Sequence, residues 1–102
     1  MKTEYAIIRK IWNGIEIEIR WNRDYVQFDD GQSMAHLEVQ SIQPARAPLP
    51  ITETGYRSHF IEAENVERFG GPLEYVDAWF NELSQSHVWR NAEAASRQLA
   101  LF

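Results

Sequence analysis

The chain has 102 residues, of which 44% are hydrophobic and 13% aromatic, and it contains no cysteine. This length suits a single domain, and the hydrophobic share excludes disorder of the chain as a whole. Without cysteine there is no disulfide, no thiolate metal site and no cysteine nucleophile. Ten basic against fifteen acidic residues leave a formal charge of −5, which disfavours direct, non-specific binding of nucleic acid.

We expect no secretion signal, because Met1–Tyr5 leads directly into a strand-like pattern without an apolar segment or a cleavage site. No apolar run approaches the roughly 20 residues that a membrane-spanning helix needs. We therefore expect a cytoplasmic protein without a membrane partner. The oligomeric state is left open by the sequence.

The first twenty residues predict a β-hairpin. Asn13-Gly14 stands between two β-rich runs and suits a type I′ turn, which requires positive φ at both positions. A two-residue turn fixes the register, so Trp12 is expected to pair with Ile15 and Arg9 with Glu18, an opposite-charge pair on the polar face. Lys10 falls on the apolar face and is expected to extend to its edge.

Further strand signals follow the hairpin. Asn22-Arg23-Asp24 predicts a turn, Tyr25–Phe28 a short strand, and Asp29-Asp30-Gly31 another turn. From Met34 to Gln43 apolar and polar residues alternate, which predicts a strand with Leu37 and Val39 on one side and His36, Glu38 and Gln40 on the other. The first half of the chain is thus expected to form an antiparallel meander of about four strands.

A proline-rich connector, Pro44–Pro50, follows the meander and cannot join a regular ladder. The next segment, Ile51–Ile61, is expected to be either a strand or an ordered loop, with a turn at Thr54-Gly55. If the segment is extended, Arg57 and His59 lie on one side, and Tyr56, Ser58 and Phe60 on the other.

The second half of the chain changes to a helical period. Glu62–Phe69 predicts a short helix that ends at Gly70-Gly71, and Pro72 suits the first turn of a second helix. The apolar stripe expected to face the core is Tyr75, Val76, Trp79, Phe80 and Leu83. Ser84 or Ser86 is expected to cap a last helix over residues 87–96.

Together these signals predict an α+β fold in which two or three C-terminal helices pack on one face of an N-terminal meander. Residues 1–96 are expected to form the single domain, and residues 97–102 a flexible docking tail.

No catalytic group, metal site or cofactor is expected. His36, His59 and His87 lie far apart and form none of the spacings of a zinc motif. Gly70-Gly71-Pro72 lacks the pattern of a phosphate-binding loop. The carboxylates Glu16 and Glu18 belong to the polar face of the hairpin, so neither predicts an acid–base pair.

The densest polar and aromatic segment is Ile51–Phe60. After a proline-rich connector, such a stretch is expected either to line a pocket or to form a partner surface through Glu53, Tyr56, Arg57 and His59. The alternative interpretation is an edge segment held on the sheet without a function of its own.

The last five residues give the sharpest functional signal, Gln98-Leu99-Ala100-Leu101-Phe102. They resemble the short motif, usually Gln-Leu-Ser/Asp-Leu-Phe, by which bacterial replication and repair proteins bind the sliding clamp of the DNA polymerase. Only Ala100 departs from the motif. The resemblance implies that Leu101 and Phe102 enter an apolar cleft while Gln98 and Leu99 fix the register.

A competing interpretation places the same residues on a helix. Val88, Ala92, Ala95, Leu99 and Phe102 recur at helical spacing. A helix that continues to Phe102 would pack this stripe on the core and hide the motif. A free end of the chain would expose it.

Three blocks resemble a family of short proteobacterial proteins that are often encoded on plasmids and other mobile elements. They are His36–Val39, Pro48–Phe60 and Gly70–Pro72. The resemblance would cover most of the chain and brings no catalytic residues. It implies either a clamp-docking accessory protein or an inhibitor of host defence.

Three functional hypotheses follow. The first is a non-catalytic binding protein that docks on the sliding clamp through Gln98–Phe102. The second is an inhibitor of host defence, of the anti-CRISPR kind, that acts through an acidic or aromatic surface. If the surface is acidic, it is expected to be one contiguous face that includes residues such as Glu16, Glu18, Asp29 and Asp30. The third is an enzyme with a site around Glu53, Arg57 and His59.

Overall fold

The computed structural model of the chain describes residues 4–85 and residue 90. Its elements are β1 (Ala6–Trp12), β2 (Ile15–Gln27), β3 (Ser33–Gln43), β4 (Tyr56–Glu62), α1 (Ala63–Glu67) and α2 (Pro72–Leu83). The strands form one antiparallel sheet in the order β1-β2-β3-β4. The predicted α+β fold is therefore confirmed. Of the third predicted helix, residues 87–96, only residue 90 is described.

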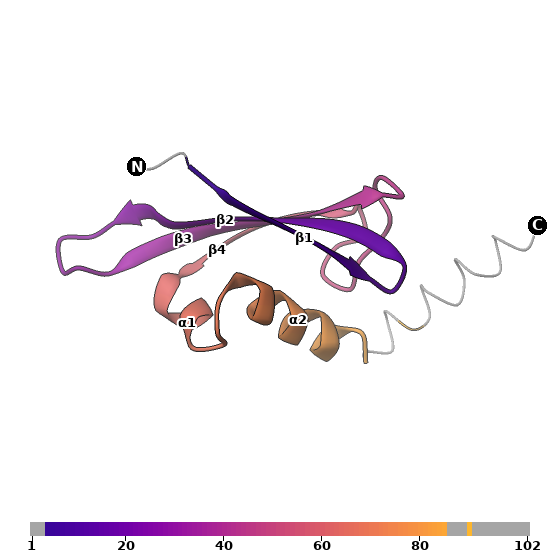
Figure 1. Ribbon diagram of the computed structural model, residues 1–102. Helices are drawn as coiled ribbons and strands as arrows, with labels where there is room; N and C mark the ends of the chain where they lie inside the picture. Colours follow the sequence, from indigo (N-terminus) through magenta and orange to yellow (C-terminus); the bar gives the residue numbers. More distant parts are fainter. Residues whose placement is uncertain (1–3, 86–89, 91–102) are drawn as a thin grey trace, which may run out of the picture.

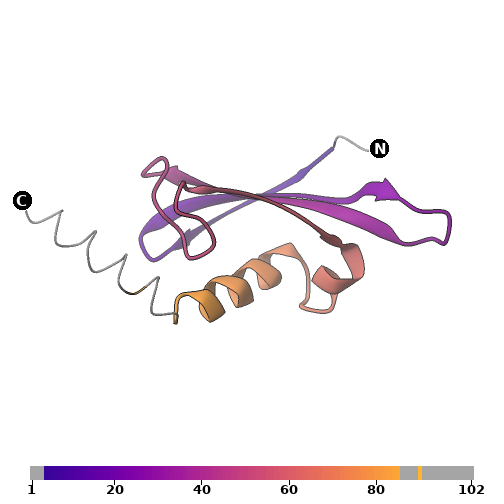
Figure 2. The same ribbon diagram turned by 180° about the vertical axis from the view of Figure 1, so that it is seen from behind.

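The sheet and the helices form two layers. Both helices lie on the same side of the twisted sheet, and no described element covers the other side (Figure 1). Viewed from behind, the β3–β4 loop bends from the sheet toward the last turn of α2 (Figure 2). Within the described residues, no helix is long and apolar enough to span a membrane.

The first hairpin has the predicted register, with Trp12 opposite Ile15 and Arg9 opposite Glu18. Asn13 and Gly14 have φ angles of 51° and 80°, which are the positive values that a type I′ turn requires. Lys10 extends from the apolar face to the carboxylate of Asp77 on α2, so the edge of the hairpin is tied to the helix layer.

The turn predicted at residues 22–24 is wrong. β2 continues through it, and its register with β3 shifts between Asn22 and Val26, which is a β-bulge. Two contacts hold the bulge: Arg23 binds Glu67 of α1, and the Ser33 hydroxyl donates to Asp24. Glu67 is remote from Arg23 in the sequence, so turn-forming composition alone did not predict a bulge.

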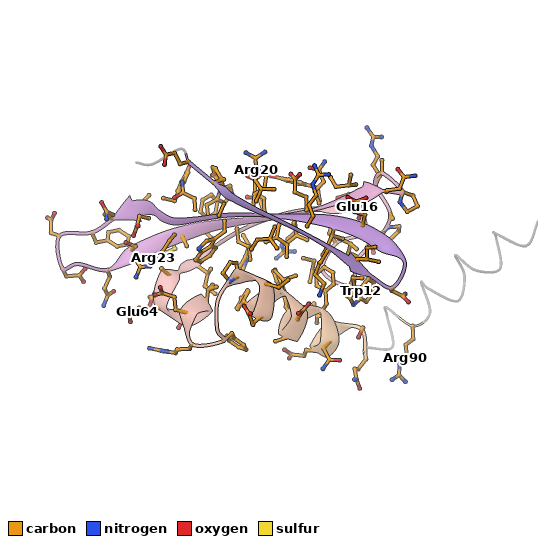
Figure 3. All side chains as sticks on the ribbon, in the orientation of Figure 1. Trp12, Glu16, Arg20, Arg23, Glu64 and Arg90 are labelled. Carbon is orange, nitrogen blue, oxygen red and sulfur yellow. The ribbon has the colours of Figure 1, made fainter. Side chains whose placement is uncertain are left out.

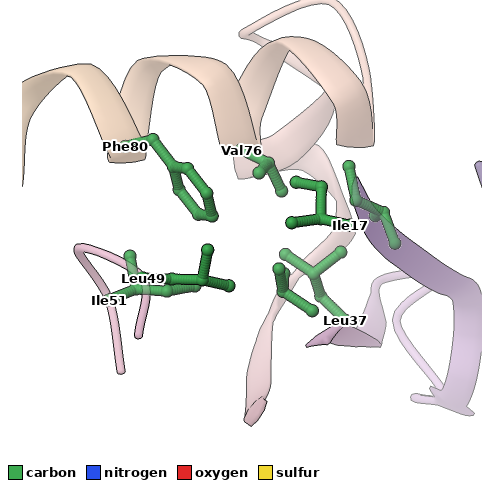
Figure 4. Close-up of a cluster of buried hydrophobic side chains, with 8 residues drawn as sticks. Ile17, Leu37, Leu49, Ile51, Val76 and Phe80 are labelled. Atoms are coloured by element: carbon green, nitrogen blue, oxygen red, sulfur yellow. The ribbon is translucent and has the colours of Figure 1, made fainter. Parts of the chain in front are cut away.

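The core lies between the sheet and α2. Its buried members from the sheet are Ile17, Ile19, Leu37 and Val39; α2 adds Val76 and Phe80, and the loop adds Leu49 and Ile51. Figure 4 shows the loop residues closing the cluster on one side, below the ring of Phe80. The proline-rich connector thus forms no ladder, as predicted, but it completes the core.

The helix boundaries also agree with the sequence. Gly70 and Gly71, both at positive φ, separate α1 from α2, and Pro72 begins α2. Val76 and Phe80 of the predicted stripe are buried, whereas Tyr75 and Trp79 are only partly buried. The latter pair turns toward β4 and contacts His59. Ser84 is the C-cap of α2.

Candidate functional site

The sheet face away from the helices is named here the open face. Since side chains alternate along each strand, the register assigns to it Ile7, Arg9, Ile11, Glu16, Glu18, Arg20, Asn22, His36, Glu38, Gln40, Tyr56, Ser58 and Phe60. In Figure 3, Glu16 and Arg20 project from this face, whereas Trp12 points to the helix layer. Tyr5 precedes β1 and reaches the open face through His36.

Hydrogen bonds and ring contacts join a cluster of Tyr5, Tyr25, His36, Ser58 and Phe60 on the open face, called here the ring cluster. The Tyr5 hydroxyl lies 2.6 Å from Nδ1 of His36, and the Ser58 hydroxyl lies 2.7 Å from Nε2. The His36 ring stacks on Phe60 with a centroid distance of 4.5 Å and an interplanar angle of 15°. Tyr25 packs beside the same imidazole at 5.2 Å.

Both nitrogens of His36 are therefore occupied. A neutral imidazole donates through one nitrogen and accepts through the other, and a hydroxyl can supply either role. The two hydrogen bonds that link Ser58, His36 and Tyr5 in series have the connectivity of a nucleophile, a base and an orienting group. The Glu38 carboxylate, however, is directly opposite Ser58 across the strand pair. The Glu38 carboxylate lies 4.0 Å from Nδ1 of His36, so an acidic group stands beside this series of hydrogen bonds.

Glu38 is the charged centre of the open face. It accepts a 2.5 Å hydrogen bond from the Tyr56 hydroxyl and lies 3.8 Å from Nε of Arg20. The hydrogen bond to Glu38, followed by burial, raises the pKa of Tyr56. Burial and then the charge of Glu38 raise the pKa of Tyr5, whose ring lies 5.1 Å from the Arg20 guanidinium.

Large apolar side chains border these polar groups. Ile7 is 57% exposed and Ile11 72% on the β1 side, and Tyr56 is 43% exposed and Phe60 54% on the β4 side. Such side chains on an uncovered sheet face favour contact with another surface over contact with water. The open face is therefore suited to binding.

The predicted acidic surface is not one contiguous face. Glu16 and Glu18 lie near the β1–β2 turn, where both are paired with Arg9, at 3.5 and 3.0 Å. Asp29 and Asp30 lie in the β2–β3 turn, at the opposite end of the sheet (Figure 1). The structure does not bring the two pairs together, and the open face carries both signs of charge.

The four residues predicted in the segment after the connector are divided between two faces. Tyr56 lies on the open face, and Arg57 and His59 lie on the helix side, as alternation predicted. Arg57 donates to the Ile51 carbonyl and lies over the Trp79 ring. Glu53 is exposed in the loop, and no ion pair within 4.0 Å joins it to Arg57 in the described part of the chain.

His59 is held by the aromatic side of α2. Its ring lies 4.7 Å from Trp79 and its Nε2 3.3 Å from the Tyr75 hydroxyl. Burial, and then the charge of Arg57, lower the pKa of His59. The segment therefore packs Arg57 and His59 against the helix layer rather than joining them with Glu53 in one pocket.

The histidines do not assemble into a metal site where they are described. His36 lies on the open face and His59 on the helix side, and residues 4–85 and 90 contain no group of three potential metal ligands. His87 and the motif Gln98–Phe102 lie outside the described residues.

The sequence did not predict the ring cluster. Alternation along the strands placed His36 on one side with Glu38 and Gln40. It placed Ser58 on one side with Tyr56 and Phe60. Their contact depends on the β3–β4 register, which pairs His36 with Phe60 and Glu38 with Ser58. The loop between β3 and β4 is long and irregular, so no short turn motif in the sequence fixes the register of these two strands.

The fold defines a class: a small α+β domain with helices on one side of a four-stranded antiparallel sheet and, within the described residues, no element on the other. The chain matches the family model described as KlcB third domain over residues 5–89. It therefore belongs to the KlcB third-domain family, whose members are uncharacterised and often plasmid-associated. Neither the comparison with curated proteins nor the comparison with solved structures found a match.

Proposed function

We propose that this chain is a non-catalytic, cytoplasmic accessory protein that docks on the sliding clamp of the bacterial DNA polymerase through Gln98–Phe102. The observation that carries the proposal is the sequence of these five residues, four of which match the clamp-binding motif. Membership of an often plasmid-associated family agrees with a protein that recruits or modulates the host replication machinery.

Each motif position has a physical role. Leu101 and Phe102 bury apolar surface in a cleft of the clamp, which stabilises the complex by roughly 1.5–3 kcal/mol for each fully buried side chain. The Gln98 amide carries donors and an acceptor that fix the register, and Leu99 adds apolar contact. Because ordering a peptide costs conformational entropy, the expected affinity is moderate, with a Kd in the micromolar range.

Calorimetric titration of the full chain with purified clamp tests the proposal. We expect binding by the wild type and its loss in L101A/F102A. The neighbouring substitution R97A is the matched control and is expected to bind like the wild type. A100S restores a usual motif residue and is expected to tighten binding. Absence of binding by the wild type, or equal binding by L101A/F102A, would refute the proposal.

A second candidate function uses the open face. An inhibitor of a host defence protein needs a surface that covers its target, and the exposed Ile7, Tyr56 and Phe60 provide an aromatic and apolar one. Protection of phage growth against a restricting host distinguishes the two functions. An inhibitor loses protection in I7E/F60E and keeps it after removal of residues 98–102, whereas a clamp-dependent protein behaves in the opposite way.

A further inference from the structure

β4 is an edge strand, since it pairs with β3 alone among the described strands. An edge strand directs alternate N–H and C=O groups outward, where they can pair with another chain. The segment Tyr56–Glu62 contains no proline, and its pairing with β3 shows no register shift. The Tyr56 carbonyl already accepts hydrogen bonds from the Thr52 and Thr54 hydroxyls, so the template for a further strand is the outer edge of residues 57–62.

An apolar groove of about 360 Å³ lies between α1 and α2, where they meet the end of β4 at Ile61. It is lined by Ile61, Asn65, Arg68, Phe69, Tyr75, Ala78, Trp79 and Glu82. The helical members Tyr75, Ala78, Trp79 and Glu82 follow the spacing i, i+3, i+4, i+7, so they form one face of α2. This face is distinct from that of Val76 and Phe80, which fill the core.

Rings dominate the groove. Phe69 is 53% exposed and meets Tyr75 edge to face, with centroids 5.3 Å apart. The volume lies at the small end of the range of about 300–1,000 Å³ for ligand pockets, and it can accept one large side chain of a longer ligand. The groove is thus shaped for an anchoring residue of a longer ligand.

The two ends of the groove differ in charge. Arg68 follows α1, next to the end of β4, and its guanidinium donates to the Asn65 side chain. Glu82 lies in the last turn of α2, which runs back toward the start of β4 (Figure 1). A ligand along β4 therefore meets a cation beside Glu62 and a carboxylate toward Tyr56.

We propose that β4 and this groove bind an extended peptide segment of a partner protein, added to the sheet as a further antiparallel strand. Backbone hydrogen bonds to β4 supply affinity, and one large apolar side chain enters the groove. An antiparallel peptide begins beside Glu62 and ends beside Tyr56. It therefore carries an acidic residue before the anchor, opposite Arg68, and a basic residue after it, opposite Glu82.

The antiparallel direction follows from the sheet itself, in which every pair is antiparallel. Antiparallel pairs are also slightly more stable per residue than parallel ones. The surface is separate from the proposed clamp motif and from the open face, so it goes beyond the proposed function and its test is independent of Gln98–Phe102.

The test is selection from a library of capped eight-residue peptides with a fixed central phenylalanine, presented to the full chain. We expect selection of an acidic residue before the phenylalanine and a basic residue after it. Amide chemical shifts are expected to change along β4 and α2 on addition of the best peptide. N-methylation of alternate peptide backbone nitrogens is expected to weaken binding by at least about tenfold, because it removes strand pairing.

Three variants make the test specific. A78W fills the groove and is expected to abolish binding, while Q40W, a matched change on the open face, leaves it intact. R68E is expected to reverse the preference before the anchor from acidic to basic, a readout that loss of folding cannot produce. Failure to select any peptide, binding insensitive to A78W, or an unchanged preference in R68E overturns the proposal. So does a dimer of the chain that A78W disrupts, because the groove would then belong to a second copy.

Discussion

His36 and Ser58 are joined by a 2.7 Å hydrogen bond across the β3–β4 pairing. The contact holds one side chain of the edge strand to a buried imidazole of the neighbouring strand. It shows that side chains of the open face are joined to one another across strands, although no described helix covers that face. A preformed surface loses less conformational entropy on binding than a flexible one.

The first prediction concerns His36. H36L removes both hydrogen bonds and the stack on Phe60 but retains a similar volume. We expect the free energy of unfolding to fall by about 1–3 kcal/mol, because hydroxyls of Tyr5 and Ser58 lose buried partners. Urea denaturation followed by tryptophan fluorescence measures the change. Q40L, an exposed position on the same face, is the control, and equal stability of the two variants would contradict the prediction.

The second prediction compares two glycines at nearly the same φ. Gly55 and Gly14 have φ angles of +81° and +80°. A Cβ at Gly55 would lie 2.7 Å from backbone atoms of Arg46, whereas nothing lies within 4 Å of one at Gly14. G14A therefore incurs only the left-handed strain of about 1–2 kcal/mol.

G55A incurs the same strain and, in addition, forces the Arg46 backbone to move within the loop that supplies Leu49 and Ile51 to the core. We expect its loss of stability to exceed that of G14A by about 1–3 kcal/mol, the usual cost of overpacking. The midpoints of urea unfolding of the two variants give the comparison. A loss no greater in G55A than in G14A would show that the loop yields without cost.

These results indicate which features the sequence could predict. The register of the first hairpin followed from Asn13-Gly14, because a two-residue turn leaves no freedom between its strands. The α1–α2 boundary followed from Gly70-Gly71-Pro72 for the same local reason. In each case the residues that determine the structure are adjacent in the chain.

The bulge in β2 and the ring cluster have the opposite origin. Arg23 is held by Glu67, and His36 by Tyr5 and Ser58, all of them remote in sequence. A turn and a bulge at residues 22–24 have the same local sequence pattern. The partner that stabilises the bulge lies on α1, a helix far along the sequence, so the local pattern cannot distinguish them. The division of residues between the two sides of each strand was therefore predicted, but not the contacts between strands.

The third prediction concerns the link between β2 and α1. Nε and Nη2 of Arg23 each donate a 3.0 Å hydrogen bond to the Glu67 carboxylate. These bonds lower the pKa of Glu67 below its ordinary value of 4.5. The stabilisation they provide is thus present above pH 4.5 and is lost as the pH falls through the lowered pKa of the folded state.

Carbon-detected NMR titration of the Glu67 carboxyl group measures this effect. We expect the pKa of Glu67 to rise toward 4.5 in R23Q and, because the pair is exposed, also in the wild type at high salt. R68Q removes a nearby cation that does not bind Glu67 and serves as the control. A pKa of Glu67 unaffected by R23Q would mean that the ion pair does not persist in solution.

The fourth prediction concerns the pH dependence that His59 confers. Burial against Trp79 and Tyr75, followed by the charge of Arg57, lowers the pKa of His59 from its ordinary value of 6.5. The unfolded chain therefore binds a proton at this site at a higher pH than the folded chain does. Linkage requires the stability to be complete above pH 6.5 and to fall as the pH falls through 6.5 toward the lower pKa of the folded state.

H59Q removes the titrating group and is expected to flatten the dependence of unfolding free energy on pH between about 7.5 and 5.5, a range above the titration of most carboxylates. R57Q keeps the imidazole but removes the repelling charge, so it is expected to raise the pKa of His59 and weaken the dependence without abolishing it. Urea denaturation at a series of pH values gives the curves. A parallel loss of stability in the wild type and H59Q over this range would contradict the prediction. It would mean that the His59 ring binds its proton as readily in the folded state as in the unfolded chain. Packing against α2 would then not disfavour the charged form of the ring.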